Sequence, residues 1–149
     1  MTQRAESSGP PWWDAWRGIL FANARVLRAA ERDLQEHSGM SLAFLDVLGR
    51  LYDAPEDSLR ITELQQRSLF TPSGMTRLVD RVEEAGLVRR ERVPGDRRGI
   101  SVVLTPEGRR IHEEALARHQ ADVQRELASR LTPEQLRAVA DALWCFWHE

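Results

Sequence analysis

Apolar residues recur at intervals of mostly three, four or seven along the first forty positions of the chain. They are Trp12, Trp16, Ile19, Leu20, Leu27, Ala30 and Leu34. This spacing places them on one side of a helix and predicts a long amphipathic helix over residues 11–37. Pro10 and Pro11 suit the start of such a helix, and Gly39 suits its end.

Two shorter helices are predicted next. Ser41 can cap the first of them, which must end before Pro55. Its apolar residues are Leu42, Leu45, Leu48 and Leu51. Residues 55–58 predict a short polar loop, and Thr62 is a candidate N-cap for a brief helix over residues 63–68.

A fourth helix is predicted with Thr71 as its N-cap and Pro72 at its first position, running to a left-handed stop at Gly86. Its apolar face consists of Met75, Leu78, Val79 and Val82. Turning that face inward leaves the opposite face near the N-terminus to Ser73, Gly74, Thr76, Arg77 and Asp80. The predicted outer face is therefore small, polar and basic.

The apolar pattern then changes from helical to strand-like. Residues 87–93 and 100–104 are compatible with strands, and the Pro, Gly and Asp of residues 94–99 predict the turn between them. Two further helices are predicted to start after Thr105 and Thr132. The first carries Ile111, Ala115, Val123 and Leu127, and the second has a capping box formed by Thr132 and Gln135.

This order of elements predicts a mainly α fold with a small β-hairpin wing, because a short helix, a longer helix and a hairpin together make a winged helix-turn-helix. Arg77 has the fork geometry that binds guanine, while Ser73 and Thr76 can bond bases or phosphates. The positive end of the helix would attract a phosphate near Ser73 and Gly74. A capped amphipathic helix with one outward Arg is nevertheless common in proteins of many kinds.

The tip of the predicted hairpin adds weight to a DNA-binding interpretation. Arg97 and Arg98 project from a tight turn, which suits insertion into a minor groove. Asp96 beside them can hold one guanidinium in a fixed direction. A solvated charged turn would explain the polarity of the tip, but not its position directly after a helix-turn-helix.

Two segments, TRLVDRVEEAGLVRR at residues 76–90 and DRRGISVVLTPEG at residues 96–108, resemble the MarR family of winged-helix transcriptional regulators. The resemblance implies a major-groove helix from about Thr71 to Ala85, Arg98 in the minor groove and Arg97 on phosphate. It leaves Arg81 as either a phosphate contact or the partner of an acid. The expected DNA-binding set is Thr71, Ser73, Gly74, Thr76, Arg77, Arg81, Asp96, Arg97 and Arg98.

The two ends of the chain contain more apolar helix than a winged helix needs. The resemblance implies that the terminal helices of two subunits interlock into a homodimer, which would bind a pseudo-palindromic operator. The expected dimerisation residues are Trp12, Trp13, Trp16, Leu20, Leu136, Leu143, Trp144 and Trp147. The alternative is that the Trp residues complete a monomeric core.

The chain is expected to form a single domain over residues 1–149. Within it, residues 41–104 would be the DNA-binding lobe, and residues 11–37 and 106–148 the dimerisation helices. Eleven Arg and seven acidic residues give Arg60 to Arg110 a net charge of +4, although the whole chain carries −2. Absence of a secretory signal and of a long apolar run predicts a cytoplasmic protein with no membrane partner.

No sequence motif indicates catalysis, so an enzyme, a cofactor and a metal are not expected. His112 and His119 lie seven residues apart and are better explained as solvated or partly packed side chains than as ligands. Cys145, the lone cysteine, lies in the run WCFW, where helical packing is expected to bury it.

The resemblance also implies a small aromatic or anionic effector that releases a repressor from DNA. Arg25, Arg28 and the Trp-rich ends are candidates for its pocket, although surface and core roles suit them better. A second functional hypothesis remains open: a dimeric ligand-binding or protein-interaction module whose winged helix does not bind DNA.

Overall fold

The computed structural model describes residues 9–68, 74–93, 95–96 and 99–146. Helices and strands follow one another along the chain in the order that the apolar pattern predicts, with one additional strand. The elements are α1 (Pro11–Ser38), α2 (Leu42–Tyr52), η1 (Pro55–Asp57), β1 (Ser58–Arg60), α3 (Ile61–Arg67), α4 (Met75–Glu84), β2 (Val88–Arg92), β3 (Ile100–Leu104), α5 (Pro106–Ala128), α6 (Pro133–Leu143) and η2 (Trp144–Phe146). None of the helices in these described ranges is long and apolar enough to span a membrane.

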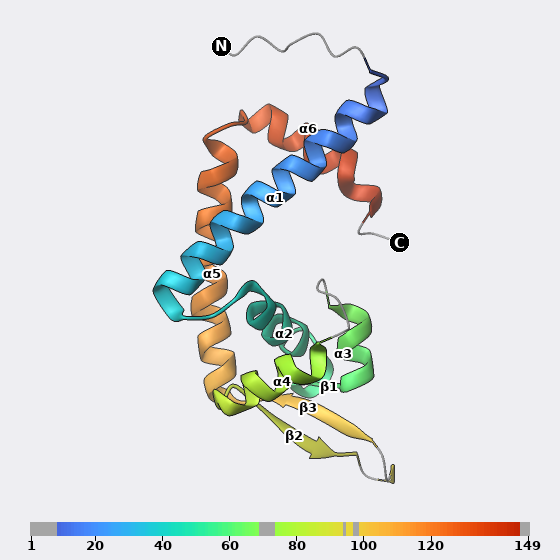
Figure 1. The fold of residues 1–149 in the computed structure, drawn as a ribbon, viewed down its shortest axis with the longest axis vertical. Helices are drawn as coiled ribbons and strands as arrows, with labels where there is room; N and C mark the ends of the chain where they lie inside the picture. Colours follow the sequence, from blue (N-terminus) through green and yellow to red (C-terminus); the bar gives the residue numbers. More distant parts are fainter. Residues whose placement is uncertain (1–8, 69–73, 94, 97–98, 147–149) are drawn as a thin grey trace.

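Two parts of the molecule are separated along its long axis (Figure 1). The elements from α2 to β3 form one end, which we call the winged lobe. At the other end lie the N-terminal half of α1, together with α6 and η2, which we call the terminal helices. Helix α5 runs between the two parts and packs against both α1 and α2.

A small antiparallel sheet in the order β1-β3-β2 forms the base of the wing. Its first strand was not expected, because the sequence of residues 55–58 predicts only a loop. Leu59 lies opposite Val102 in β3, and both side chains are buried. A three-residue strand is too short to show an alternating pattern, so its pairing with β3 is the feature that reveals it.

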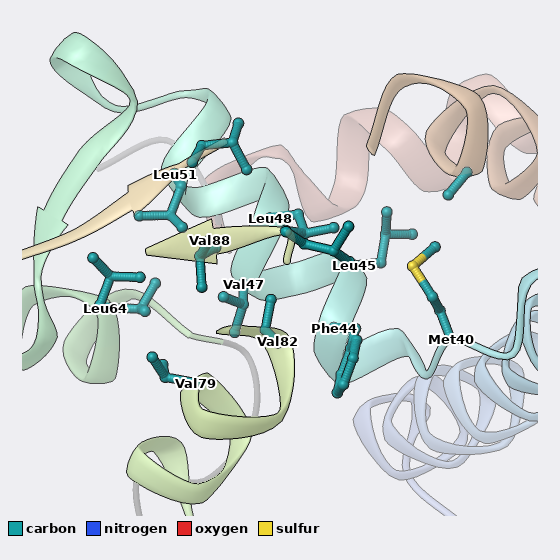
Figure 2. Close-up of a cluster of buried hydrophobic side chains, with 14 of the residues drawn as sticks. Met40, Phe44, Leu45, Val47, Leu48, Leu51, Leu64, Val79, Val82 and Val88 are labelled. Atoms are coloured by element: carbon teal, nitrogen blue, oxygen red, sulfur yellow. The ribbon is translucent and has the colours of Figure 1, made fainter. Parts of the chain in front are cut away.

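The hydrophobic core fills the space between α2, α3, α4 and the sheet (Figure 2). Leu48 and Leu51 from α2, Leu64 from α3, Val79 from α4 and Val102 from β3 are each completely buried. These positions are the apolar ones at helical or strand spacing. The winged lobe therefore has a core built within one chain.

Several predicted helix ends are confirmed. The Ser41 hydroxyl accepts a hydrogen bond from Phe44 N at 3.3 Å, and Gly39 ends α1 in the left-handed conformation at φ 66°. Thr132 and Gln135 form the predicted capping box at the start of α6. Each of these helix ends depends on residues within a few positions of one another, which is why the sequence alone reveals them.

Two other predicted caps are wrong. Helix α3 begins at Ile61 rather than Glu63, with Arg60 at the N-cap and the Glu63 side chain accepting from its backbone N–H at 2.9 Å. Helix α4 begins at Met75 with Gly74 as its N-cap. Thr71 and Pro72, the predicted start, lie outside the described residues. Gly74 has φ 153°, which L side chains rarely adopt, so glycine suits this turn.

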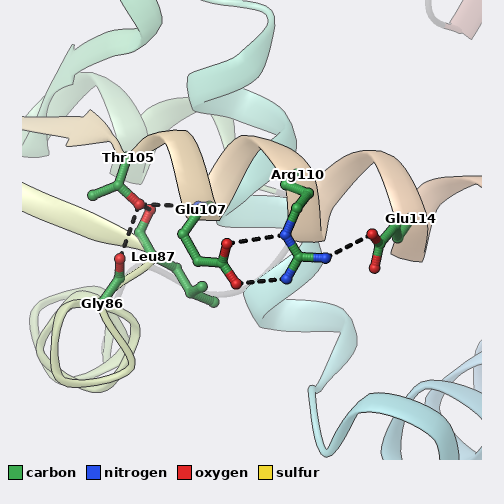
Figure 3. A network of polar contacts seen from close by, with 7 residues as sticks. Gly86, Leu87, Thr105, Glu107, Arg110 and Glu114 are labelled. Atoms are coloured by element: carbon green, nitrogen blue, oxygen red, sulfur yellow. Dashed lines mark hydrogen bonds and ion pairs between the residues drawn. The ribbon is translucent and has the colours of Figure 1, made fainter.

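The junction between the winged lobe and α5 is tightly built (Figure 3). The Thr105 hydroxyl accepts a hydrogen bond from Gly108 N at 2.9 Å and donates one to the carbonyl oxygen of Gly86 at 2.9 Å. A Cβ on Gly108 would lie only 2.0 Å from the carbonyl oxygen of Leu87. Close backbone contact here requires glycine and ties the end of α4 to the start of α5.

Candidate nucleic-acid interface

Helix α4 buries and exposes the faces that its sequence predicts. Met75, Val79 and Val82 are at most 1% exposed, and Leu78 is half-buried. Thr76 and Arg77 are exposed on the opposite face, next to the exposed Gly74. Ser73 and Thr71 lie outside the described residues. The helix therefore offers a small, polar and basic surface at its N-terminal half.

Arg81 lies farther along the same helix, and among the described residues it forms no ion pair with an acid. Its guanidinium carbon stands 5.1 Å from the centre of the Phe44 ring in α2, within cation–π range. The side chain is thus directed back toward the lobe. Arg81 is exposed all the same, so its contact with phosphate stays a prediction.

The wing hairpin closes through its own backbone. Val93 N donates to the Gly99 carbonyl at 3.0 Å, and Asp96 N donates to the Val93 carbonyl at 3.1 Å. Gly95 supplies the left-handed turn at φ 81°. Arg98, the predicted minor-groove residue, and Arg97, the predicted phosphate contact, lie outside the described residues.

Asp96 binds an arginine that the sequence did not suggest. Arg60 Nη1, from β1, donates to Asp96 Oδ2 at 2.8 Å. This bond joins β1, an edge strand of the sheet, to the wing tip, 36 positions apart in the chain. Arg60 was not predicted as part of the site, because nothing near it in sequence indicates the pairing.

Arg90 is a second arginine that the sequence analysis missed. From β2 it reaches across to α4, where its Nη2 lies 2.6 Å from Asp80 Oδ1. Its Nη1 pairs with Glu83, and its backbone N–H also donates to Glu83, at 2.8 Å. The wing strand is therefore fastened along the flank of α4.

The expected dimerisation residues are mostly exposed. Trp12, Trp13, Trp16, Leu20 and Trp144 are each at least 43% exposed, Leu136 and Leu143 are half-buried, and Trp147 lies outside the described residues. The alternative in which these Trp residues complete a monomeric core is wrong for the described ones. Their apolar surface is left uncovered by this chain.

Cys145 and the histidines also have defined environments. Cys145 is exposed, so the expectation of a buried thiol is wrong. His112 is 4% exposed and packs against the Tyr52 ring, with ring centres 4.9 Å apart. Burial lowers the pKa of both His112 and His119. Within the described ranges no group of three His, Cys, Asp or Glu side chains is arranged to hold a metal.

A short helix, a second helix with an exposed polar face and a hairpin fastened beside it define a winged helix-turn-helix protein. The sequence model of the MarR family matches residues 38–99. The solved structure of Sco3205 from Streptomyces coelicolor, a MarR family transcriptional regulator in complex with DNA, is 30% identical with a TM-score of 0.78. It covers 94% of this chain and 91% of that one. The chain belongs to the MarR family.

Two other relatives extend the comparison. The transcriptional repressor MdtR of Bacillus subtilis is 36% identical over 103 residues, which span 69% of this chain but only 65% of MdtR. Apo MarR from E. coli has a TM-score of 0.81 at 24% identity, covers 96% of this chain and 100% of that chain, and shows the same fold.

Proposed function

We propose that this protein is a sequence-specific, double-stranded-DNA-binding transcriptional regulator, and more narrowly a repressor. The observation that carries the proposal is the pairing of an exposed polar face on α4 with a wing strand fastened alongside it. An α-helix of this kind fits the major groove, and a projecting hairpin reaches the next minor groove. The complex of Sco3205 with DNA supports this assignment.

Within the interface, Arg77 would read guanine, while Gly74 and Thr76 would allow the backbone to approach the groove and bond phosphate or base. Arg97, Arg98, Ser73 and Thr71 keep the roles given by the family resemblance. If each half-site neutralises about four phosphates, the salt dependence of a dimer would have a slope on the order of −7.

We further propose that the protein acts as a homodimer through its terminal helices. Helix α6 has no buried residue, and Trp12 and Phe146 are 67% and 78% exposed. Such an apolar surface is typical of a protein interface. Twofold symmetry would then require operator half-sites about 34–36 Å apart. The division into a DNA-binding lobe at 41–104 and flanking dimerisation helices belongs to this proposal.

A pocket of about 220 Å³ between α1 and α5 is the candidate effector site. Its lining is Asp33, Leu34, His37, Ser38, Met40, Ile111, Glu114, Ala115 and Arg118. Arg25 and Arg28 do not line it, and Arg25 instead pairs with Glu126 at 2.6 Å. Asp33 and Glu114 line the pocket together with His37 and Arg118, so both an aromatic and an anionic effector remain candidates. An effector there would release DNA only if it prefers the non-binding conformation.

Selection of duplexes from a random-sequence library by the purified protein, followed by footprinting, tests this function. We expect enrichment of a pseudo-palindromic site protected over both half-sites. Recovery of no preferred sequence would favour the alternative, a dimeric ligand-binding or protein-interaction module. A transcription assay from a promoter carrying the selected site then separates repression from activation.

A further inference from the structure

Arg90 makes the most extensive side-chain contact between the wing and α4 among the described residues. Its guanidinium pairs with Glu83 and with Asp80, the latter at 2.6 Å, and its Nη2 lies 3.4 Å from the Thr76 carbonyl oxygen. The Glu83 carboxylate accepts from the backbone and from the side chain of Arg90. One residue of β2 therefore touches three successive turns of α4.

The position of Arg90 in its strand explains how it reaches the helix. It lies opposite Val102 in β3 and two residues after the buried Val88, so it shares the face of β2 that points toward the core. Its side chain is 23% exposed. Burial lowers the pKa of Arg90, but the bonds to Glu83 and Asp80 outweigh this and leave its pKa above the ordinary value.

The two acids lie close to the residues proposed to touch DNA. Asp80 stands one helical turn after Thr76 and three residues after Arg77. Asp80 and Glu83 are 49% and 35% exposed. Without a cation between them, two carboxylates would face the phosphates of a bound duplex and repel them.

We propose that Arg90 is a positioning residue, which fixes α4 against the wing and screens the carboxylates of Asp80 and Glu83 from DNA. This rests on the DNA-binding function proposed above. A helix held at a set angle to the wing presents Arg77 and the wing tip to one duplex together, and such placement decides sequence preference.

Arg89 provides a matched control on the neighbouring position. It points to the other face of β2, is 51% exposed, and pairs with Glu91 of its own strand at 2.7 Å. An exposed pair of this kind contributes little to stability or position. Substituting Arg89 removes the same charge as substituting Arg90 but leaves α4 untouched.

The experiment compares Arg90→Ala, the double variant Asp80→Ala with Glu83→Ala, and Arg89→Ala. Each full-length protein is titrated with two probes: a duplex that the unchanged protein selects from a random library, and a random duplex of the same length. The ratio of the two affinities measures sequence preference. The affinity for the random duplex measures general attraction to phosphate. Thermal unfolding checks that each variant is folded.

We expect the ratio to fall about tenfold in both Arg90→Ala and the double variant, because either change frees α4 from the wing. Their affinities for the random duplex should move in opposite directions, by about threefold, since the first change exposes two carboxylates and the second removes them. Arg89→Ala should weaken both affinities slightly and keep the ratio. General destabilisation would not produce shifts of opposite sign.

The proposal is overturned if the double variant keeps the full ratio, whether or not Arg90→Ala folds, since alanine is well tolerated in a helix. A ratio that falls equally in Arg89→Ala would also overturn it. If the unchanged protein binds both probes alike, the proposed DNA-binding function itself fails, and this result is distinct from either of the others.

Discussion

The winged lobe and the terminal helices bury their apolar side chains in different ways. In the lobe, Leu48 and Val102 are completely buried by residues of the same chain. In the terminal helices, Trp12 is 67% exposed and α6 has no buried residue. One chain is therefore enough to position the interface proposed for DNA, whereas the apolar side chains of the terminal helices stay exposed among the described residues, as the proposed dimer would explain.

The largest expected effect comes from replacing a glycine by alanine at the junction of the winged lobe with α5, compared with the same replacement in the terminal helices. Gly108→Ala should lower the free energy of unfolding by about 3 kcal/mol, because the new Cβ would lie 2.0 Å from the Leu87 carbonyl oxygen. Gly18→Ala in α1 meets nothing within 4 Å and should raise it by about 0.5–1 kcal/mol. Urea unfolding measures both. A loss at Gly18 would mean that a second chain packs against that position.

Removing an aromatic side chain from the terminal helices should affect association. Trp16, which is 51% exposed, is expected to contribute about 2 kcal/mol to dimer formation, so Trp16→Ala should weaken the dimer about thirtyfold. Ile100→Ala, at a residue 43% exposed in the wing strand, should leave association unchanged. Gel filtration followed by light scattering, over a dilution series, measures the dissociation of the dimer in each variant. A monomer for the unchanged protein at micromolar concentration contradicts the proposed dimer.

An arginine of the lobe and one of the terminal helices should differ in their effect on DNA binding. Arg77→Ala is expected to weaken binding to the selected duplex by about 1–3 kcal/mol, since a guanine contact is lost. Arg25→Ala removes only an ion pair with Glu126 on α5 and should leave binding within about 0.5 kcal/mol. Equal losses in a fluorescence-anisotropy titration would contradict the placement of the interface on α4.

The smallest effect is a pH dependence on α5, which joins the two regions. Burial lowers the pKa of His112 and His119 in the folded state below the ordinary histidine pKa of 6.5. As the pH falls through 6.5, these histidines therefore bind protons in the unfolded chain before they do so in the folded one. Stability is therefore full above that pH and falls on acidification. The slope is at most about 1.4 kcal/mol per pH unit for each histidine.

Urea unfolding between pH 7.5 and 5.5 measures this slope. A variant with both His112→Gln and His119→Gln should show a flatter curve in the same range, even if its overall stability is lower. If the pH dependence of stability is unchanged in that variant, titration of groups other than His112 and His119 is responsible for it.

How far the sequence could predict this structure depends on the distance over which each feature is determined. Burial of Met75, Val79 and Val82 follows from helical spacing within ten residues, and the caps at Ser41 and Thr132 use neighbours three residues away. Both kinds of feature were predicted. The bond from Arg60 to Asp96 and the pairing of Arg90 with Asp80 were not predicted, because each depends on how separate elements pack together.

Some predictions failed for the same reason. Thr62 has the chemistry of an N-cap, but pairing of Ser58–Arg60 with β3 fixes the chain so that α3 begins at Ile61. Cys145 was expected to be buried in an aromatic run, yet no described segment of the chain covers it.

The order of helices and strands, the inward face of α4 and the local caps were determined by the sequence itself, because periodicity and short-range hydrogen bonds act between near neighbours. Tertiary structure alone decided strand β1, the ion pairs of Arg60 and Arg90 that hold the wing, and the exposed aromatic surface of the terminal helices. These depend on contacts between segments far apart in the chain, which no local pattern specifies.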